Sequence, residues 1–205
     1  PIDIIRLAHQ PREPTTPDGM LKDATAQFLS QLGGTRSIRL AGVACAEVSP
    51  DGRWLAAAVS GCLMLRRADT GQAVKRLQGE PGKVESLAWS RDSRLLLKAG
   101  EDRVMSIFDV QTGKRVVELI DDAGVVFGAS FSGDGRLVAA ASTSNAVHIY
   151  EVATGRRIRT ITAHSGRCFE AIFSPDGRTL LTAGDKDAYA WDLDYPVRAD
   201  LAEQS

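Results

Sequence analysis

Histidine and cysteine are the side chains of this sequence best suited to bind a metal ion or transfer protons. The 205 residues contain three of each, namely His9, His148, His164, Cys45, Cys62 and Cys168. The histidines lack metal-ligand spacing and the cysteines form no CxxC motif. The sequence also lacks a glycine-rich phosphate loop and a nucleophile elbow. We therefore predict no catalytic residue, metal ligand or cofactor, and reduced thiols in a cytoplasmic protein.

Carboxylates offer a second possible chemistry, but four of them recur by position. Asp51, Asp92, Asp134 and Asp176 each follow a serine by two residues, at steps of 41, 42 and 42 residues. A catalytic residue would be expected once, whereas a fixed period near 40 residues indicates one structural unit repeated. Two of the four phrases read Ser-Pro-Asp-Gly, in which proline, aspartate and glycine each favour a tight turn. These aspartates are therefore interpreted as turn formers.

The elements around each turn are short strands. In the second repeat the apolar runs are Val84–Trp89, Leu95–Ala99, Val104–Val110 and Lys114–Ile120. Such runs are too short for free-standing helices and are typical of strands. A second repeated turn, Thr-Gly, separates the third run from the fourth. Each repeat thus predicts a four-stranded antiparallel sheet that must stack on its neighbours to bury its faces.

The third strand of three repeats ends in a similar phrase, namely Ile107-Phe108-Asp109-Val110, Ile149-Tyr150-Glu151-Val152 and Ala190-Trp191-Asp192-Leu193. With the two turn motifs and the period, these phrases resemble the WD-repeat family of β-propellers over roughly residues 37–193. The resemblance implies an all-β fold of about four four-stranded antiparallel blades, which is half of a seven- or eight-bladed ring. It also implies a protein-interaction scaffold.

The same resemblance implies a buried hydrogen-bond network in the fourth repeat, the only one with a family-like histidine. Its members would be His164, Thr182, Asp185 or Asp187, and Trp191. In the family this network is structural, so no catalytic role is assigned to it.

Four blades leave the closure of the ring open. Further blades of a longer chain, a second copy forming an eight-bladed ring, another protein, or a closed four-bladed ring would each solve it. Residues 37–41 resemble a fourth strand, and the last repeat lacks one, so the N-terminal strand is expected to complete the last blade.

The ends of the sequence differ from the repeats. Residues 1–36 are predicted to hold a proline-rich linker over 10–19 and an amphipathic helix over 20–32. The repeats are assigned to residues 37–196 and a polar tail to 197–205. The helix is expected to pack on the propeller or a neighbouring domain, or to dock a partner protein.

Residues that break the repeat pattern, and bulky residues near strand ends, are the candidates for partner binding. They are Trp54, Arg66, Arg67, Lys98, Arg167, Phe169 and Tyr189. Arginine and large aromatic residues are common interface anchors, although ordinary blade packing is an alternative for each.

Charge and hydropathy limit the remaining functions. A net charge of −1 argues against nucleic-acid binding, and no apolar stretch is long enough for a membrane helix. We therefore expect a protein-interaction scaffold, part of a larger complex and not an enzyme. The alternatives are a regulatory or sensor propeller domain of a larger multidomain enzyme and, with less support, a propeller that binds a metal or haem.

Overall fold

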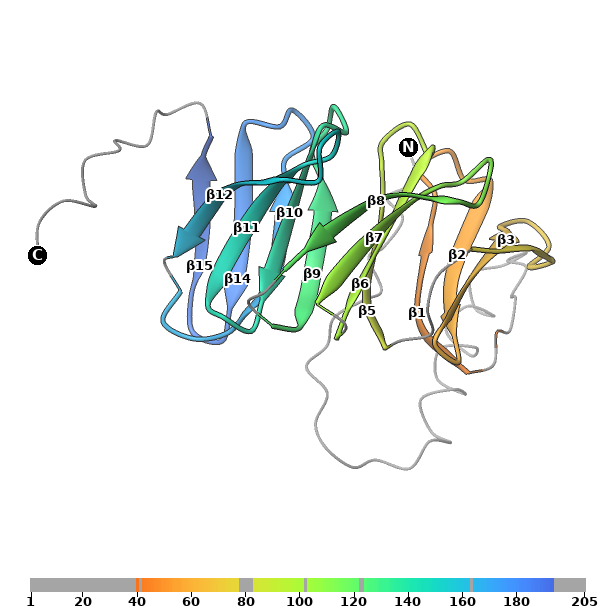
Figure 1. Cartoon of the computed structure of the whole chain (residues 1–205), viewed down its shortest axis with the longest axis horizontal. Coiled ribbons are helices and arrows are strands. Elements are labelled where there is room, and N and C mark those ends of the chain that lie inside the picture. The colour runs from red at the N-terminus through yellow and green to blue at the C-terminus, as the bar shows by residue number, and fades with distance from the viewer. Residues whose placement is uncertain are drawn as a thin grey trace, which may run out of the picture. The chain divides into compact units, whose positions relative to one another are not determined.

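The computed structural model describes residue 40 and residues 42–77, 83–101, 103–121, 124–162 and 164–193. In these ranges the chain forms four antiparallel sheets, which we call blades 1 to 4 in chain order (Figure 1). Blade 1 holds β1 (Val43–Val48), β2 (Trp54–Val59), β3 (Cys62–Arg67) and β4 (Ala73–Arg76). Blade 2 holds β5 (Val84–Trp89), β6 (Leu95–Gly100), β7 (Val104–Asp109) and β8 (Arg115–Ile120). Blade 3 holds β9 (Val126–Phe131), β10 (Leu137–Ser142), β11 (Ala146–Glu151) and β12 (Arg157–Thr162), and blade 4 holds β13 (Cys168–Phe173), β14 (Thr179–Gly184) and β15 (Ala188–Asp192).

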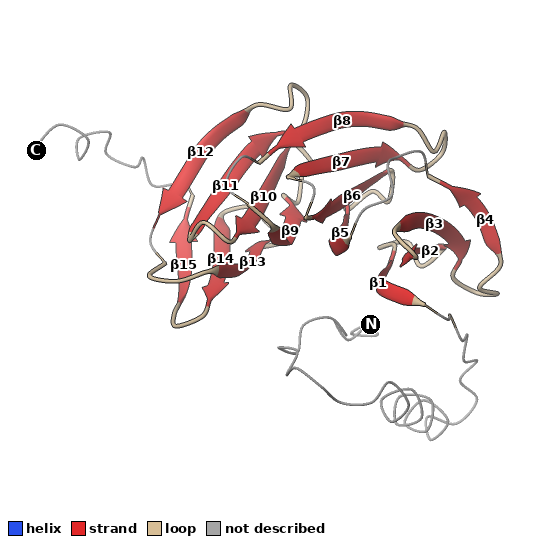
Figure 2. Ribbon diagram, turned by 60° about the horizontal axis from the view of Figure 1, so that its bottom comes forward, coloured by secondary structure: helices blue, strands red, loops and turns tan. Residues whose placement is uncertain are grey.

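The predicted all-β fold is confirmed, as are the four blades and the missing fourth strand of the last one among the described residues. Within each blade the strands pair in chain order with antiparallel neighbours (Figure 2). The N-terminal helix, the strand at 37–41 and the C-terminal tail lie in or overlap parts of the chain outside the described residues. Within the described ranges, no helix has the length and apolar character needed to cross a membrane.

The turn between the first two strands is built in the same way in every blade. In blade 3 the Ser132 hydroxyl donates to Asp134 Oδ1 at 2.6 Å, and the same oxygen accepts the Arg136 N–H at 3.0 Å. The Ser132 hydroxyl oxygen in turn accepts the Leu137 N–H at 2.9 Å. The serine hydrogen bond is the main reason that the pKa of Asp134 lies below its usual range. These contacts explain why serine and aspartate recur with the period of the fold.

Blade 2 departs from this turn at Ser93, where the other blades have glycine. Ser93 has a φ of 60°, a left-handed conformation that costs a non-glycine residue about 1–2 kcal/mol. Its hydroxyl accepts the backbone N–H of Asp51 in blade 1 at 3.1 Å. The hydrogen bond between neighbouring blades therefore offsets the backbone strain at Ser93.

Within the described part of the chain the core consists of three apolar layers, one between each pair of consecutive blades. We call the side of a blade that meets the next blade its forward face and the opposite side its rear face. Between blades 1 and 2 the forward-face residues Leu63 and Leu65 cluster with the rear-face residues Leu96 and Phe108. Blades 2 and 3 meet through an equivalent cluster, as do blades 3 and 4. Because side chains alternate along a strand, each blade needs an apolar set on both faces.

The first strands of consecutive blades lie next to one another, and small residues allow this approach. A Cβ atom on Gly128 would lie 2.3 Å from the backbone oxygen of Phe169 in the next blade. The Ser130 hydroxyl accepts the Phe173 N–H at 3.1 Å, and the Ser86 hydroxyl accepts the Ala129 N–H at 3.3 Å. Backbone groups facing the neighbouring blade are thereby satisfied, which fixes one blade against the next.

Candidate functional site

The best-connected polar cluster lies inside blade 4. Trp191 Nε1 donates to the Thr182 hydroxyl at 2.9 Å, and that hydroxyl lies 2.8 Å from His164 Nε2. On the other side of the ring, His164 Nδ1 lies 2.5 Å from Asp187 Oδ1. The Asp187 carboxylate accepts a hydrogen bond from Nδ1–H. The Thr182 hydroxyl, which already accepts the Trp191 N–H, has its own proton to donate to Nε2. The hydrogen bond between His164 Nδ1 and Asp187 is the main cause of the lowered pKa of Asp187.

The two aspartates that the sequence offered for this network have different partners. Asp187 contacts the histidine, whereas Asp185 Oδ2 accepts the Arg167 backbone N–H at 3.0 Å and lies 3.4 Å from Arg167 Nε. The assignment of Asp185 to the network is therefore corrected to Asp187. The connection from Ala183 to its partner Ala188 is one residue shorter than the equivalent connection from Ala141 to Val147, so the repeat alignment was ambiguous here.

A second histidine–aspartate pair, which sequence reasoning missed, lies between blades 2 and 3. His148 Nδ1 lies 2.9 Å from Asp121 Oδ2, and both side chains are buried. Asp121 directly follows β8, so the pair joins the end of one blade to the third strand of the next. The signal in the sequence was Asp121 itself, a charged residue directly after a predicted strand, and it did not indicate a partner.

Blade 1 carries three of the predicted partner-binding residues, and two of them line one shallow hollow. Trp54 and Arg67 border it together with Gly52, Arg53 and Asp69. Arg67 makes two hydrogen bonds to Asp69, of 2.9 and 2.7 Å. In blade 2 the equivalent strand end is Asp109, which accepts the Thr112 N–H. Arg67 with Asp69 thus replaces a turn contact, and this accounts for its departure from the repeat.

Arg66 has no such explanation. Its Nη1 donates to the Gly71 carbonyl oxygen at 2.9 Å. Its Nε atom is buried and has no hydrogen-bond partner among the described residues.

Two other predicted partner-binding residues, Lys98 and Tyr189, differ in accessibility. Lys98 is only 5% exposed, because it occupies a central position of β6 between β5 and β7. The prediction that Lys98 binds a partner at the protein surface is therefore wrong. Tyr189 is 37% exposed and contacts the His164 ring edge-to-face and the Trp191 ring at a tilt, with centroid separations of 5.1 and 5.3 Å. It covers the hydrogen-bond network on its solvent side.

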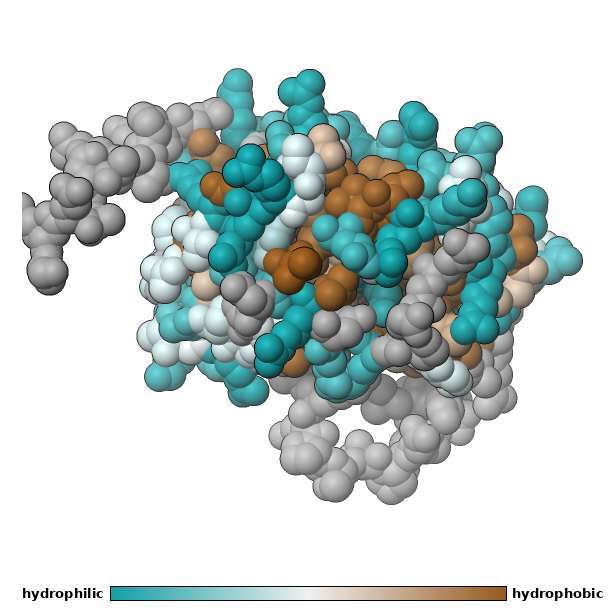
Figure 3. Space-filling view, in the orientation of Figure 1, coloured by the Kyte–Doolittle hydropathy of each residue, from teal (hydrophilic) through white to brown (hydrophobic). Residues whose placement is uncertain are grey.

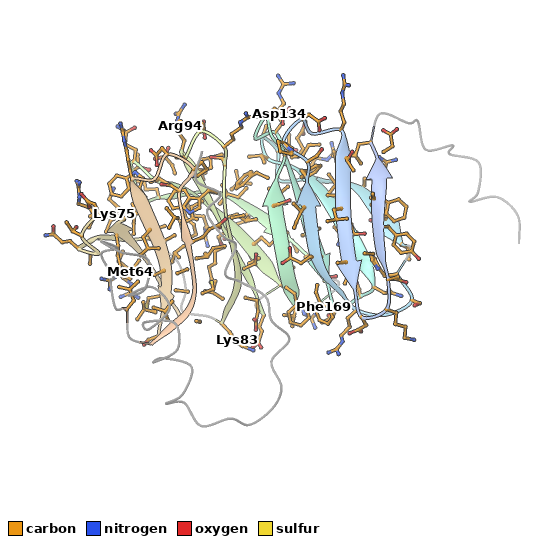
Figure 4. All side chains as sticks on the ribbon, turned by 180° about the vertical axis from the view of Figure 1, so that it is seen from behind. Met64, Lys75, Lys83, Arg94, Asp134 and Phe169 are labelled. Atoms are coloured by element: carbon orange, nitrogen blue, oxygen red, sulfur yellow. The ribbon has the colours of Figure 1, made fainter. Side chains whose placement is uncertain are left out.

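The remaining two candidates, Arg167 and Phe169, come together with a third residue. The Arg167 guanidinium lies 5.5 Å from the centroid of the Phe169 ring, within cation–π range. Phe127 of β9 lies 5.3 Å from the same ring. Figure 4 shows Phe169 at the end of the sheets that also carries Lys83, opposite the end with Arg94 and Asp134. We call Phe127, Arg167 and Phe169 the aromatic–arginine cluster.

Apolar side chains also reach the surface on the fourth strands. Val116, Ile120 and Ile158 are 52, 68 and 55% exposed. Figure 3 shows apolar surface around β8 with polar side chains on both sides of it. Scattered apolar residues of this kind are ordinary for an outer strand. The lysine and arginine side chains that interrupt them protect its free edge.

The described residues contain no group of three or more histidine, cysteine, aspartate or glutamate side chains placed to hold a metal ion. All three cysteines are free thiols. Burial raises the pKa of Cys45 to about 12 and that of Cys168 to about 11. Both thiols therefore stay protonated near neutral pH and are poor nucleophiles.

Comparison with known proteins finds two matching families and one structural relative of note. Residues 55–127 match the anaphase-promoting complex subunit 4 WD40 domain, and residues 155–192 match the WD domain, G-beta repeat. A chain in a crystal structure of the mitotic checkpoint complex superposes with a TM-score of 0.67 at 22% sequence identity. That superposition covers 73% of this chain and 47% of the other, and it shows a shared fold.

A curated relative is similar over a shorter stretch. The meiotic recombination protein Rec14 of Schizosaccharomyces pombe is 36% identical over 67 residues, which is 32% of this chain. The matched part is 22% of the length of that protein. The chain thus spans about half, or less, of the proteins it resembles.

Proposed function

Because this chain belongs to the WD-repeat family of β-propellers, we propose that it is a protein-interaction scaffold without catalytic activity, acting as an assembly or regulatory part of a larger complex. The solved relative comes from a multi-subunit assembly, and one matching family is named for a subunit of another. The three free cysteines are compatible with a cytoplasmic location.

The observation that carries the proposal is the aromatic–arginine cluster. Arg167 keeps 59% of its side chain exposed while it covers the Phe169 ring. Two phenylalanines from different blades are thus held side by side on a rigid framework. Rings and guanidinium groups that are positioned in advance lose little conformational entropy when a partner covers them.

The cluster also has the electrostatic character of a protein interface. Arg167 contacts Asp185, so its charge is partly balanced, and the whole chain has a net charge of −1. A nucleic-acid surface would instead present several cations free to contact phosphates. We therefore propose a polypeptide partner at this end of blades 3 and 4.

The test is quantitative co-purification of proteins with tagged wild type, Phe169→Asp and Ile158→Asp. Ile158 is the matched control, because it is an exposed apolar residue on the outer strand β12. We expect Phe169→Asp to lose at least one stoichiometric partner that Ile158→Asp retains. Equal partner sets for all three proteins would refute a binding role for the cluster.

A further inference from the structure

The shallow hollow of blade 1 is a second candidate binding site, separate from the aromatic–arginine cluster. It has a volume of about 430 Å³ and is lined by Gly52, Arg53, Trp54, Arg67 and Asp69. Arg53 directly follows the turn between the first two strands of its blade, as Arg94 does in blade 2. Figure 4 places Arg94 at the opposite end of the sheets from Phe169. The hollow and the cluster therefore lie at opposite ends of the blades.

Trp54 gives the hollow an aromatic wall that the other blades lack. By the repeat period the equivalent residues are Leu95, Leu137 and Thr179. Trp54 is half-buried and packs against the apolar layer between blades 1 and 2. Within the described ranges its Nε1–H makes no hydrogen bond, whereas those of Trp89 and Trp191 each have an acceptor. The indole of Trp54 is thus a fixed apolar surface with one donor available to a ligand.

Two guanidinium groups line the hollow with the indole, and both keep donors available. Arg53 is 81% exposed, and its Nε lies 3.9 Å from Asp51 Oδ2, which is too long for a hydrogen bond. Arg67 uses Nε and Nη2 to bind Asp69, which leaves its Nη1 without a partner among the described residues. Each carboxylate oxygen of Asp69 thereby already accepts one hydrogen bond. The lining residues therefore present mainly donors to a ligand.

The charges of the lining residues select the kind of ligand. Arg53 and Arg67 carry two positive charges and Asp69 carries one negative charge, so the lining has a net charge of 2 − 1 = +1. A single carboxylate complements this charge and accepts charge-assisted hydrogen bonds from guanidinium groups. A phosphate dianion would instead lie beside the Asp69 carboxylate, and a nucleic acid needs several cations free to contact phosphates. An apolar group next to the carboxylate would cover the indole.

We propose that this hollow binds an acidic segment of a polypeptide partner. A glutamate or aspartate of the segment accepts hydrogen bonds from Arg53 and Arg67, and a neighbouring apolar side chain packs on Trp54. The site goes beyond the proposed contact at the aromatic–arginine cluster and does not depend on it. A scaffold with one contact site at each end of its blades can hold two partners at once.

Nuclear magnetic resonance of the isotope-labelled full chain would test the site through the indole N–H signal of Trp54, which Trp54→Phe would assign. The probe is a short capped peptide of alternating leucine and glutamate, and the matched peptide has glutamine in place of glutamate. We expect the glutamate peptide to shift the Trp54 signal saturably and to leave those of Trp89 and Trp191 unchanged. The glutamine peptide should bind at least about fivefold more weakly.

Arg53→Gln and Arg136→Gln are the matched variants of the chain. Arg136 is exposed and occupies the same turn position in blade 3, where Leu137 takes the place of the tryptophan. We expect Arg53→Gln to weaken binding of the glutamate peptide by about fivefold or more, and Arg136→Gln to leave it unchanged. Both side chains are exposed, so both variants should fold, which circular dichroism would verify.

Three results would overturn the proposal. They are equal binding of the two peptides, an equal loss of binding in the two variants, and no shift of the Trp54 signal by the glutamate peptide. Inorganic phosphate or single-stranded DNA that shifts this signal at a lower concentration than the glutamate peptide would also overturn it, because the hollow would then recognise phosphate. These results leave the aromatic–arginine cluster unaffected, since the Phe169 variant tests that site separately.

Discussion

Thr182 is the centre of the hydrogen-bond network in blade 4, and replacing it by valine removes the hydroxyl with little change in shape. The side chain is fully buried, accepts the Trp191 Nε1 proton at 2.9 Å and lies 2.8 Å from His164 Nε2. Thr182→Val leaves the buried His164 acceptor and the partly buried Trp191 donor without their partner, and a fully buried group left in this way costs about 1–3 kcal/mol. We expect a loss of about 2–4 kcal/mol, a large part of the typical stability of a domain.

Urea unfolding followed by tryptophan fluorescence and circular dichroism would measure this loss. Thr160→Val is the matched control, because Thr160 is an exposed residue of the neighbouring outer strand β12 and should change stability by less than about 0.5 kcal/mol. A double-mutant cycle of Thr182→Val with Trp191→Phe should give a coupling free energy of about 0.5–3 kcal/mol, because the two residues share a hydrogen bond. If Thr182→Val were as stable as Thr160→Val, the network would not hold the blade together.

Three further predictions concern the contacts between blades and the turns. Ser93→Ala should destabilise the chain by about 1 kcal/mol, because it keeps the strained φ and loses the hydrogen bond from the Asp51 N–H. Ser93→Gly should be close to neutral, because it loses the same bond but relieves the strain; the reverse order in denaturant unfolding would contradict this. Gly128→Ala should lower the thermal midpoint by several degrees, because its Cβ would clash with the Phe169 backbone; an unchanged midpoint in calorimetry would mean that the strands separate freely. Ser132→Ala should reduce stability at pH 7, and the stability difference from wild type should shrink as the pH falls below about 4. The reason is that the lowered pKa of Asp134 stabilises the fold only while its carboxyl is ionised. A stability difference that is constant with pH would point to another cause.

The repeated elements could be predicted from the sequence because they depend on local chemistry. Val84–Trp89 was expected as a strand with these bounds and is observed, and the strand expected over Leu95–Ala99 is one residue longer in the structure. Alternating apolar residues and Ser-Asp turns act within one blade, where the period preserves their spacing.

Contacts between repeats were harder to predict, because they depend on geometry that one repeat does not contain. Lys98 was predicted to bind a partner, but β6 is an inner strand of blade 2, and both faces of that blade are covered by neighbouring blades. Phe127 was missed as the partner of Phe169, because the two rings are 42 residues apart and meet only when β9 and β13 lie side by side.

Hydrogen exchange measured on the chain alone and in its purified native complex would test the scaffold function most directly. The account predicts slower exchange in residues 124–131 and 164–173, which surround the aromatic–arginine cluster, and no change in the outer strand β12. Protection confined to the outer strands β4, β8 and β12, with the cluster unchanged, would contradict it.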